Sequence, residues 1–325
     1  MGISVERDII KLFMRHLKKQ GDLPLGDDAG AIKVGGEWLV ATNDMLVRRT
    51  DVPDIMTPEQ VGFKAVTMNV SDVAAMGAKP IGFLFSLGVP EDMESGYLEG
   101  VAEGIGRALE FYDVPVLSAD TNEADDLIID GIALGRTRRL LTRSGARPGE
   151  LVCVTGDIGR ALAGLLVWKN GLEVPAKVRG ALYEKLLEPR ARVEEGSKLS
   201  EVASAAIDIS DGLSKELHLL SEMSGVGIEV EAERLPIREE VLEVAEITGM
   251  KPVDIALASG EEFEIVFTIP EDTLETLEIE CTPIGRTFKG GGTYVTTKGK
   301  RQRMPLMGWE HLNRGVKEKN WAFLR

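Results

Sequence analysis

The chain has 325 residues, 43% of them hydrophobic and 28% charged, with a formal net charge of −15. The length predicts about two domains, and the acidic charge argues against binding to nucleic acid or to an anionic membrane surface. We expect no membrane span, because no apolar run approaches the ~20 residues a span needs. We expect no signal peptide, because the N-terminus lacks an apolar h-region.

Few residues suited to metal–thiolate or imidazole chemistry are available. The only cysteines are Cys153 and Cys281, without a CxxC pair, which argues against a disulfide framework or zinc site and fits a reducing cytoplasm. The three histidines are scattered along the chain. If the protein is an enzyme, we therefore expect carboxylates to carry its chemistry.

The first elements surround a pair of adjacent acids. Residues 4–20 predict an amphipathic helix with Ser4 as its N-cap. The loop Gly26-Asp27-Asp28-Ala29 follows. Its neighbouring carboxylates repel each other unless a cation offsets their charge, although such a string also occurs in ordinary turns. A strand that ends in residues 38–42 comes next, and Asp44 is expected at its carboxyl edge, where open α/β folds bind ligands.

The next segment predicts a helix with an acid in its apolar stripe. Thr57 and Gln60 form a capping box, and Pro58 suits the first helical position. Asp72 shares one face with apolar residues at helical spacing. An unpaired buried carboxylate costs several kcal/mol, so Asp72 needs a partner. The candidates are a metal, Lys64 or Lys79, backbone N–H groups, or a break in the helix near 69–71.

The rest of the first half predicts a helix over 95–112 and strands over 114–117 and 128–134. Asp120 follows the first of these strands. Composition shifts near 137–149, and we place the domains at 1–140 and 141–325.

The second half repeats the pattern of an acid after a strand. We expect a strand over 151–156 and helices over 157–170 and 177–203. A strand over 205–209 then leads into a helix that stops at Gly225. Asp208 and Asp211 bracket this turn. Ser210 and Asp211 either assist anion binding at the helix N-terminus or act as plain N-caps.

The last elements are strands. Residues 263–269 alternate as a half-buried strand does, and 283–304 predict one or two hairpins with a basic, solvated edge. Trp309 and Trp321 lie in a polar C-terminal segment, where an aromatic residue is more often a core residue than a stacking platform.

The acids form one candidate set with a common chemistry. Sharing a cleft requires divalent cations, and oxygen-only ligands favour Mg²⁺ or Ca²⁺. Mg²⁺ shared between carboxylates and phosphates is typical of phosphoryl transfer, although no Walker GxxxxGK[ST] string is present. The set consists of Asp27, Asp28, Asp44, Asp72, Asp120, Asp208 and Asp211.

Six strings in order resemble the thiamine-monophosphate kinase family, within the ATP-binding superfamily of aminoimidazole ribonucleotide synthetase. They are GDDAG at 26–30, TNDMLV at 42–47, FKAVTMNVSDVAAMGAKP at 63–80, LTRSGARPGE at 141–150, DISDGL at 208–213 and SGEEFEIVF at 259–267. The resemblance implies a cytoplasmic, Mg²⁺-dependent enzyme that phosphorylates thiamine monophosphate with ATP. It also implies a homodimer of two-domain α/β chains, with an N-terminal mixed sheet paired across the dimer and a C-terminal α/β sandwich.

The resemblance also assigns roles by position. The implied catalytic residues are Asp72, Asp120 and Arg143, and the implied ATP contacts are Asp120, Arg143 and Ser210. Asp51, Glu261 and Trp309 fall at substrate-contacting positions, Trp309 by stacking. The implied metal site takes in Asp27, Asp28, Thr42, Asn43, Asp44, Asp72, Asp120, Asp208 and Asp211.

Two departures keep alternatives open. Asp51 stands where the family commonly has a histidine, and Ser118-Ala119 replaces a glycine pair before Asp120. The chain is therefore also compatible with an ATP-dependent enzyme of the superfamily that acts on another small phosphorylated or amide substrate. A third interpretation is a non-catalytic paralogue that binds metal or nucleotide.

Overall fold

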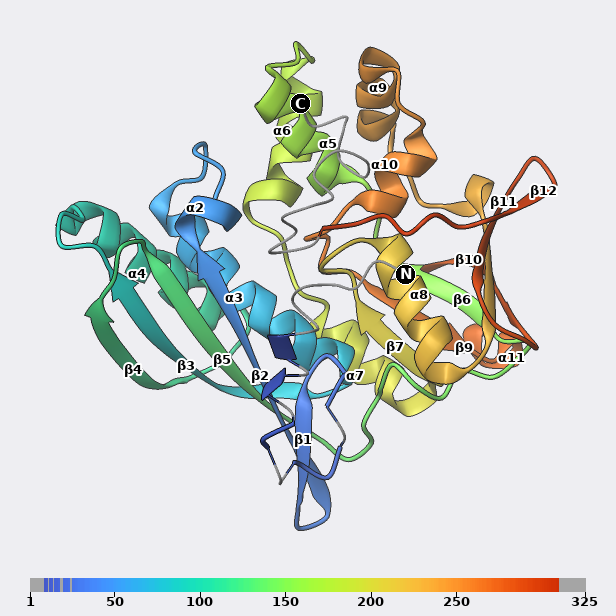
Figure 1. The fold of residues 1–325 in the computed structure, drawn as a ribbon, viewed down its shortest axis with the longest axis horizontal. Helices are drawn as coiled ribbons and strands as arrows, with labels where there is room; N and C mark the ends of the chain where they lie inside the picture. Colours follow the sequence, from blue (N-terminus) through green and yellow to red (C-terminus); the bar gives the residue numbers. More distant parts are fainter. Residues whose placement is uncertain (1–8, 11, 14, 18–19, 24, 310–325) are drawn as a thin grey trace.

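The structure is a computed structural model that describes residues 9–10, 12–13, 15–17, 20–23 and 25–309. Most of the helix predicted over 4–20, its N-cap Ser4, and Trp321 lie outside these residues. The described chain forms two mixed α/β units, each built on its own sheet, so the predicted two-domain α/β architecture is confirmed (Figure 1). Within the described residues, no helix is long and apolar enough to cross a membrane. The domain limits at 140 and 141 remain a prediction.

The first sheet has five strands in the order β1-β2-β5-β3-β4. Its neighbours are antiparallel except for the parallel pair β3–β4. The helices α3 and α4 pack on one face, where Val66 and Val70 join Leu46, Phe83 and Ile129 in a buried core. The elements are β1 (Gly30–Val34), β2 (Glu37–Val47), α2 (Arg48–Asp51), α3 (Pro58–Ala75), β3 (Lys79–Val89), α4 (Ser95–Phe111), β4 (Val116–Glu123) and β5 (Ile128–Thr137).

Helix α3 begins as the sequence predicts. The Thr57 hydroxyl accepts the Gln60 N–H at 3.4 Å, and the Gln60 side chain accepts the Thr57 N–H at 3.0 Å, with Pro58 in the first turn. The helix then runs unbroken to Ala75, so the suggested break near 69–71 is wrong.

Two predicted strand ends are wrong. Strand β2 continues to Val47, because its pairing with β5 extends from Trp38 to Val47, and Asp44 therefore lies inside the strand opposite Gly131. Strand β4 continues to Glu123 and contains Asp120. It is an edge strand with every residue exposed, so its polar side chains carry no burial cost.

The second sheet has seven strands in the order β12-β11-β8-β10-β6-β9-β7. Helix α8 packs in the core on one of its faces and α7 in a separate core cluster. The strands are β6 (Leu151–Thr155), β7 (Ala205–Asp208), β8 (Gly227–Glu231), β9 (Ile265–Ile269), β10 (Cys281–Phe288), β11 (Thr293–Thr297) and β12 (Lys300–Arg303). The helices are α5 (Arg160–Asn170), α6 (Ala176–Leu187), α7 (Val193–Val202), α8 (Leu213–Ser224), η1 (Ala232–Arg234), α9 (Glu239–Thr248), α10 (Pro252–Ala258) and α11 (Glu271–Leu274).

Three expectations for this half are corrected. The helix predicted over 177–203 is two helices, α6 and α7, separated at Pro189, which cannot continue a helix. Strand β9 starts at Ile265 and is wholly buried, because it lies between β6 and β7. In the region 283–304, β11 and β12 form a hairpin with an exposed basic edge as predicted, but β10 pairs with β6 and β8.

The two units meet along α3. Ser71 in α3 donates to Asp208 at the end of β7, across the two units. Helix α7 approaches the end of α3 through Gly196, where any side chain would collide with the Ala74 carbonyl oxygen.

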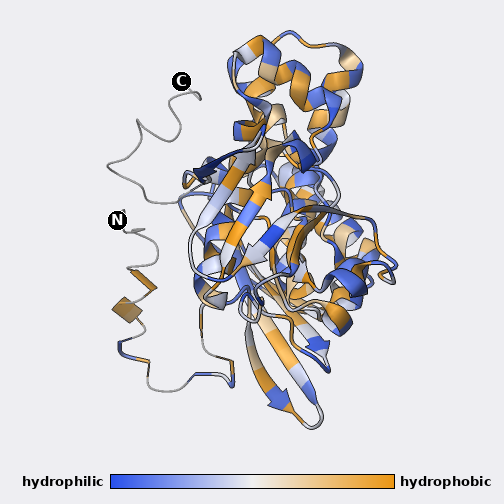
Figure 2. Ribbon diagram, turned by 90° about the vertical axis from the view of Figure 1, so that its right-hand side faces the viewer, coloured by the Kyte–Doolittle hydropathy of each residue, from blue (hydrophilic) through white to orange (hydrophobic). Residues whose placement is uncertain are grey.

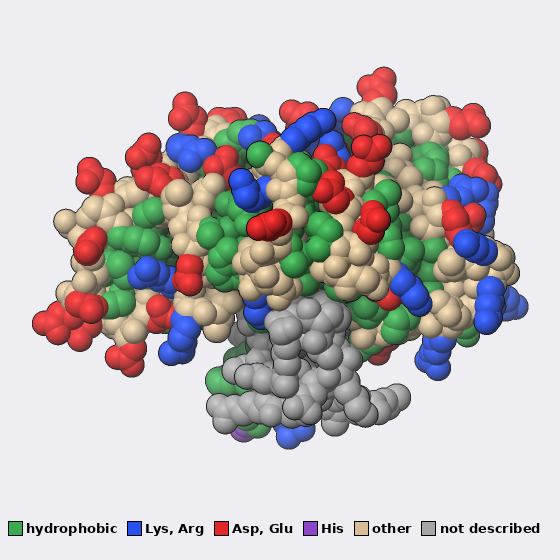
Figure 3. Space-filling view, turned by 90° about the horizontal axis from the view of Figure 1, so that it is seen from above, with side chains coloured by type: hydrophobic (Ala, Val, Ile, Leu, Met, Phe, Trp, Pro, Cys, Tyr) green, Lys and Arg blue, Asp and Glu red, His purple; other side chains and the backbone are tan. Residues whose placement is uncertain are grey.

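The surface carries charges of both signs. Figure 2 shows hydrophilic and hydrophobic residues alternating along the elements, and Figure 3 shows Lys and Arg dispersed among Asp and Glu over one face.

Candidate active site

Three acids from three elements meet between the two units. Asp28 comes from the turn before β1, Asp72 from α3 and Asp208 from the end of β7. Carboxylate oxygens of all three lie within 4.8 Å of one another. Asp208 is 1% exposed and Asp28 9% exposed. We call these residues the acid cluster.

Repulsion within the acid cluster is incompletely compensated. Among the described residues, Asp28 Oδ2 and Asp208 Oδ1 are buried without a hydrogen-bond partner. Burial, together with repulsion from Asp28, raises the pKa of Asp208 to about 8. Burial and the charges of Asp44, Asp208 and Asp28 raise the pKa of Asp72 well above its usual value. Such a set is stabilised as carboxylates only by a cation, so its donors fit Mg²⁺.

Two hydroxyl groups fix the orientation of the acid cluster. Thr42 Oγ1 donates to Asp72 Oδ2 at 2.6 Å, and Ser71 Oγ donates to Asp208 Oδ2 at 2.6 Å. Each leaves the other oxygen of its carboxylate for a further ligand. Asp72 therefore pairs with Thr42 and not with Lys64 or Lys79, the two lysines that the sequence suggested. Lys64 forms an ion pair with Glu261 instead.

Arg143 joins the linker between the units to the acidic turn. Its guanidinium donates to Asp28 Oδ1 from Nη2 at 2.6 Å and to the Gly26 carbonyl at 3.0 Å. Its main-chain N–H donates to Asp27 Oδ1 at 2.8 Å. Burial raises the pKa of Asp27 to about 6, against the opposing effect of this hydrogen bond. Arg143 thus offsets part of the negative charge and fixes the turn.

The polar residues of β2 divide between its two faces. Asp44 lies on the α3 side, where its N–H donates to Asn69 Oδ1 at 2.9 Å and its charge raises the pKa of Asp72. Asn43 is exposed on the opposite face, because successive side chains of a strand alternate. The structure therefore brings Asp44, but not the Asn43 side chain, toward the acid cluster.

Asp120 lies apart from the acid cluster in a single chain. It is exposed on the edge strand β4, in register with Ser86 of β3. Its predicted roles in metal and ATP binding remain predictions.

Ser210 and Asp211 form the turn between β7 and α8. Gly212 is the N-cap of α8 and no side chain caps it, so the plain N-cap alternative for Ser210 and Asp211 is wrong. Asp211 pairs with Lys215, and its main-chain N–H donates to Glu216 Oε1 at 3.0 Å. Glu216 is buried, and burial together with the charge of Asp211 raises its pKa well above the usual value.

The three predicted substrate contacts lie on segments tied to this site. Glu261 Oε1 is 2.5 Å from Lys64 Nζ, and the Asp51 carboxylate accepts the Val47 N–H at 2.8 Å. Trp309 is 39% exposed, and its N–H donates to the Asp211 carbonyl at 2.8 Å. This hydrogen bond places the backbone of Trp309 beside the Ser210–Asp211 turn.

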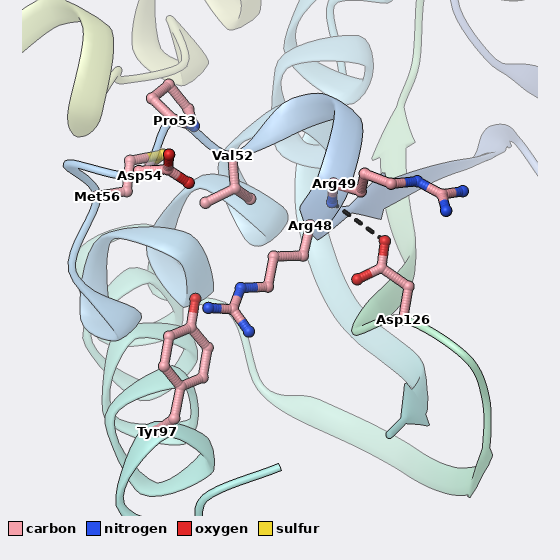
Figure 4. Close-up of a pocket in the computed structure, with 8 residues that line it drawn as sticks. All are labelled: Arg48, Arg49, Val52, Pro53, Asp54, Met56, Tyr97 and Asp126. Carbon is pink, nitrogen blue, oxygen red and sulfur yellow. Dashed lines mark hydrogen bonds between the residues drawn. The ribbon is translucent and has the colours of Figure 1, made fainter. Parts of the chain in front are cut away.

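A cavity of about 570 Å³ opens beside α2, the helix that ends at Asp51 (Figure 4). The Arg48 guanidinium lies 4.5 Å from the centre of the Tyr97 ring, and Asp126 accepts the Arg49 N–H at 3.1 Å. Its lining combines charged, aromatic and apolar groups.

Sequence reasoning missed Ser71 and Glu216, and it considered Lys64 only as a partner of Asp72, whereas Lys64 pairs with Glu261. Ser71 directly precedes Asp72, and Glu216 lies in the first turn of α8, close to Asp211 in the sequence, so proximity to a predicted acid was the available signal. Their partners lie in other elements or across the turn and depend on the fold.

Models of the AIR synthase related proteins match both halves of the chain. The N-terminal domain model matches residues 26–137 and the C-terminal domain model residues 147–298. The thiamine-monophosphate kinase of Pyrococcus abyssi is 52% identical over 311 residues, which cover 96% of this chain and 97% of that protein.

Solved structures are similar over nearly the same span. The structure of AaThiL complexed with AMPPCP and TMP aligns with a TM-score of 0.86 at 34% identity, covering 94% of this chain and 97% of that one. Thiamine monophosphate kinase from Aquifex aeolicus aligns with a TM-score of 0.81 at 33% identity, covering 92% and 99%.

Proposed function

The chain belongs to the AIR synthase related family and, within it, to the thiamine-monophosphate kinases, and we propose that it transfers the γ-phosphoryl group of ATP to thiamine monophosphate, giving thiamine diphosphate. The observation that carries this proposal is the acid cluster, whose two unpartnered buried oxygens come from opposite halves of the chain.

The acid cluster holds Mg²⁺ in this proposal. Asp28, Asp72 and Asp208 supply its carboxylates, and Asp27, Asp44 and Asp211 lie on adjoining segments. Thr42 is assigned with them on the strength of its contact with Asp72. Bound Mg²⁺ neutralises the negative charge of the ATP phosphates, which is the usual contribution of metal ions to phosphoryl transfer.

The protein's own groups position the reactants. Arg143 and Ser210 contact ATP, and Glu261 and Asp51 face the cationic thiazolium end of the acceptor, with Trp309 stacked on its rings. An oxygen of the acceptor phosphate attacks the γ-phosphorus in line, the bond from this phosphorus to the β–γ bridging oxygen breaks, and ADP leaves. No strong general base is required, because a phosphate monoester is already ionised at neutral pH.

The active form in this proposal is a homodimer. Helices α3 and α4 pack on one face of the first sheet (Figure 1). Met45, Val116 and Leu117 of that sheet are each more than half exposed. Uncovered apolar residues on a sheet are typical of a surface that pairs with another chain. A second copy would cover them and bring Asp120, on the exposed edge strand, to a shared nucleotide site. We also propose a cytoplasmic location, which fits the two free cysteines.

The test is to incubate the purified protein with ATP, Mg²⁺ and thiamine monophosphate and to measure thiamine diphosphate by chromatography, with Asp72→Asn as the matched variant. We expect product from the wild type and almost none from the variant. Mg²⁺-dependent ATP binding without diphosphate formation would favour another acceptor. ATP binding without turnover of any phosphorylated or amide acceptor would favour the non-catalytic paralogue.

A further inference from the structure

A buried lysine connects the two segments that carry the predicted acceptor contacts. Lys64 lies in α3 and is 1% exposed. Its Nζ is 2.5 Å from Glu261 Oε1 and donates to the Asp51 carbonyl oxygen at 2.9 Å. A buried ammonium group is stable only with such partners. Lys64 therefore joins a residue of the first unit to one of the second.

The main chain around Glu261 is fixed independently of Lys64. Glu261 has a φ of +55°, an uncommon conformation for a residue with a side chain, and its N–H donates to the Ser210 carbonyl at 2.7 Å. At the preceding Gly260, a Cβ would lie 2.7 Å from the same Ser210 oxygen. This tight contact fixes the backbone against the Ser210–Asp211 turn and leaves the carboxylate direction to Lys64.

Asp51 is held in a similar way. Its carboxylate accepts a hydrogen bond from the Val47 N–H at 2.8 Å, and its carbonyl oxygen accepts one from Lys64 Nζ. The end of α2 is therefore anchored on the same ammonium group as Glu261.

We propose that Lys64 is a positioning residue for the phosphate acceptor. Lys64 pairs with Oε1 of Glu261, so that the other carboxylate oxygen of Glu261 is directed at the cationic ring of the acceptor. The hydrogen bond from Lys64 to Asp51 holds the end of α2 at a fixed distance from that ring. The inference rests on the proposed function, because Glu261 and Asp51 are assigned there as acceptor contacts. It predicts that losing Lys64 weakens acceptor binding and leaves ATP binding intact.

The experiment compares Lys64→Met and Lys64→Arg with Lys185→Met, a matched control. Lys185 is also buried and pairs with a glutamate, Glu264, at 2.6 Å. For Lys64→Met we expect the KM for thiamine monophosphate to rise about tenfold or more, with the KM for ATP within about twofold of wild type. Lys64→Arg should recover part of the loss because it keeps the charge. Lys185→Met should lower the Tm and leave the ratio of the two KM values unchanged.

A double-mutant cycle with Glu261→Gln separates positioning from a general structural effect. If Lys64 acts through Glu261, Lys64→Met should raise the KM for thiamine monophosphate much less in the Glu261→Gln background than in the wild-type protein. Additive effects, equal changes in both KM values, or an unchanged KM in Lys64→Met would overturn the proposal. If Lys64→Met is too unstable for kinetics, Lys64→Gln takes its place in the same cycle, because it also removes the charge. Calorimetry then measures the loss of thiamine monophosphate binding in each variant. A wild-type protein that binds no thiamine monophosphate would instead overturn the proposed function.

Discussion

Two groups of buried carboxylates in this molecule have opposite surroundings. In the acid cluster, Asp28 and Asp208 each keep a buried oxygen without a partner. Glu264 is equally buried, but it binds Lys185 at 2.6 Å, Arg192 Nε at 2.6 Å and the Thr155 hydroxyl at 2.7 Å. The difference lies in the positive charge that the chain provides. Glu264 has two cationic partners, whereas in the part of the chain that the structure describes the acid cluster has only Arg143 to offset its negative charge in part.

The pKa values follow the same division. Burial alone would raise the pKa of Glu264, yet Lys185 and Arg192 outweigh it and the pKa is lowered. Burial raises the pKa of Asp208 to about 8, and Arg143 does not reverse the increase. Burial therefore does not separate Glu264 from the acid cluster, whereas the positive charge that the chain places beside each of them does.

The largest expected effect is on activity, from Asp208→Asn. We expect kcat/KM to fall about 10³-fold, because one of three metal-binding carboxylates is lost. The Tm of the metal-free protein should stay the same or rise, because repulsion decreases. Steady-state kinetics and thermal denaturation in a chelator check both parts. A variant with a much lower Tm would place Asp208 with the structural acids.

Glu264→Gln should give the opposite result. The change leaves Lys185 and Arg192 without their counter-charge, and the free energy of unfolding should fall by about 3–5 kcal/mol. The folded fraction should keep kcat/KM within about threefold of wild type, because no reacting group is touched. Urea unfolding measures the stability. Loss of activity without loss of stability would contradict the comparison.

Mg²⁺ should stabilise the protein through the acid cluster alone. At a hundred times its Kd, we expect the ion to add about 2.7 kcal/mol to the free energy of unfolding. Asp208→Asn should lose most of this increment and Glu264→Gln should keep it. Titration of the Tm with MgCl₂ provides the measurement, with KCl at equal ionic strength as the control. Equal increments in both variants would mean that the ion binds elsewhere.

The two regions should also respond oppositely to pH. Asp208 has a raised pKa in the folded state, so it binds more protons there than in the unfolded chain. Its contribution to the free energy of unfolding therefore decreases as pH rises from about 4 to about 8. The slope for one proton is at most about 1.4 kcal/mol per pH unit. The lowered pKa of Glu264 contributes stability that is lost as pH falls below about 4.5. Unfolding of the metal-free protein across this range should show the first slope. Asp208→Asn should reduce it by the contribution of one group, and saturating Mg²⁺ should reduce it further, because the pKa of Asp72 is raised as well. A slope unchanged in both would assign it to other groups.

Local patterns predicted the elements that begin with a clear signal. The capping box of Thr57 and Gln60 gave the start of α3, and Asp72 was identified because a carboxylate interrupts an apolar stripe. The strand ends near Asp44 and Asp120 were misplaced, because polar residues on a partly exposed strand give the same local sequence pattern as a loop. Ser71 was missed because its partner Asp208 lies 137 residues away, and only the packing of the two units brings the pair together.

The glycine contact between α7 and α3 bears on how this protein can be recombined with its relatives. Gly196 lets the backbone of α7 rest against the Ala74 carbonyl, two residues beyond Asp72 in α3. A chimaera that takes its second half from another chain would keep Asp72 aligned with Asp208 only if the donor also has a residue without a side chain at this point. The two halves are therefore expected to be exchanged between relatives together and not separately, although each has its own sheet.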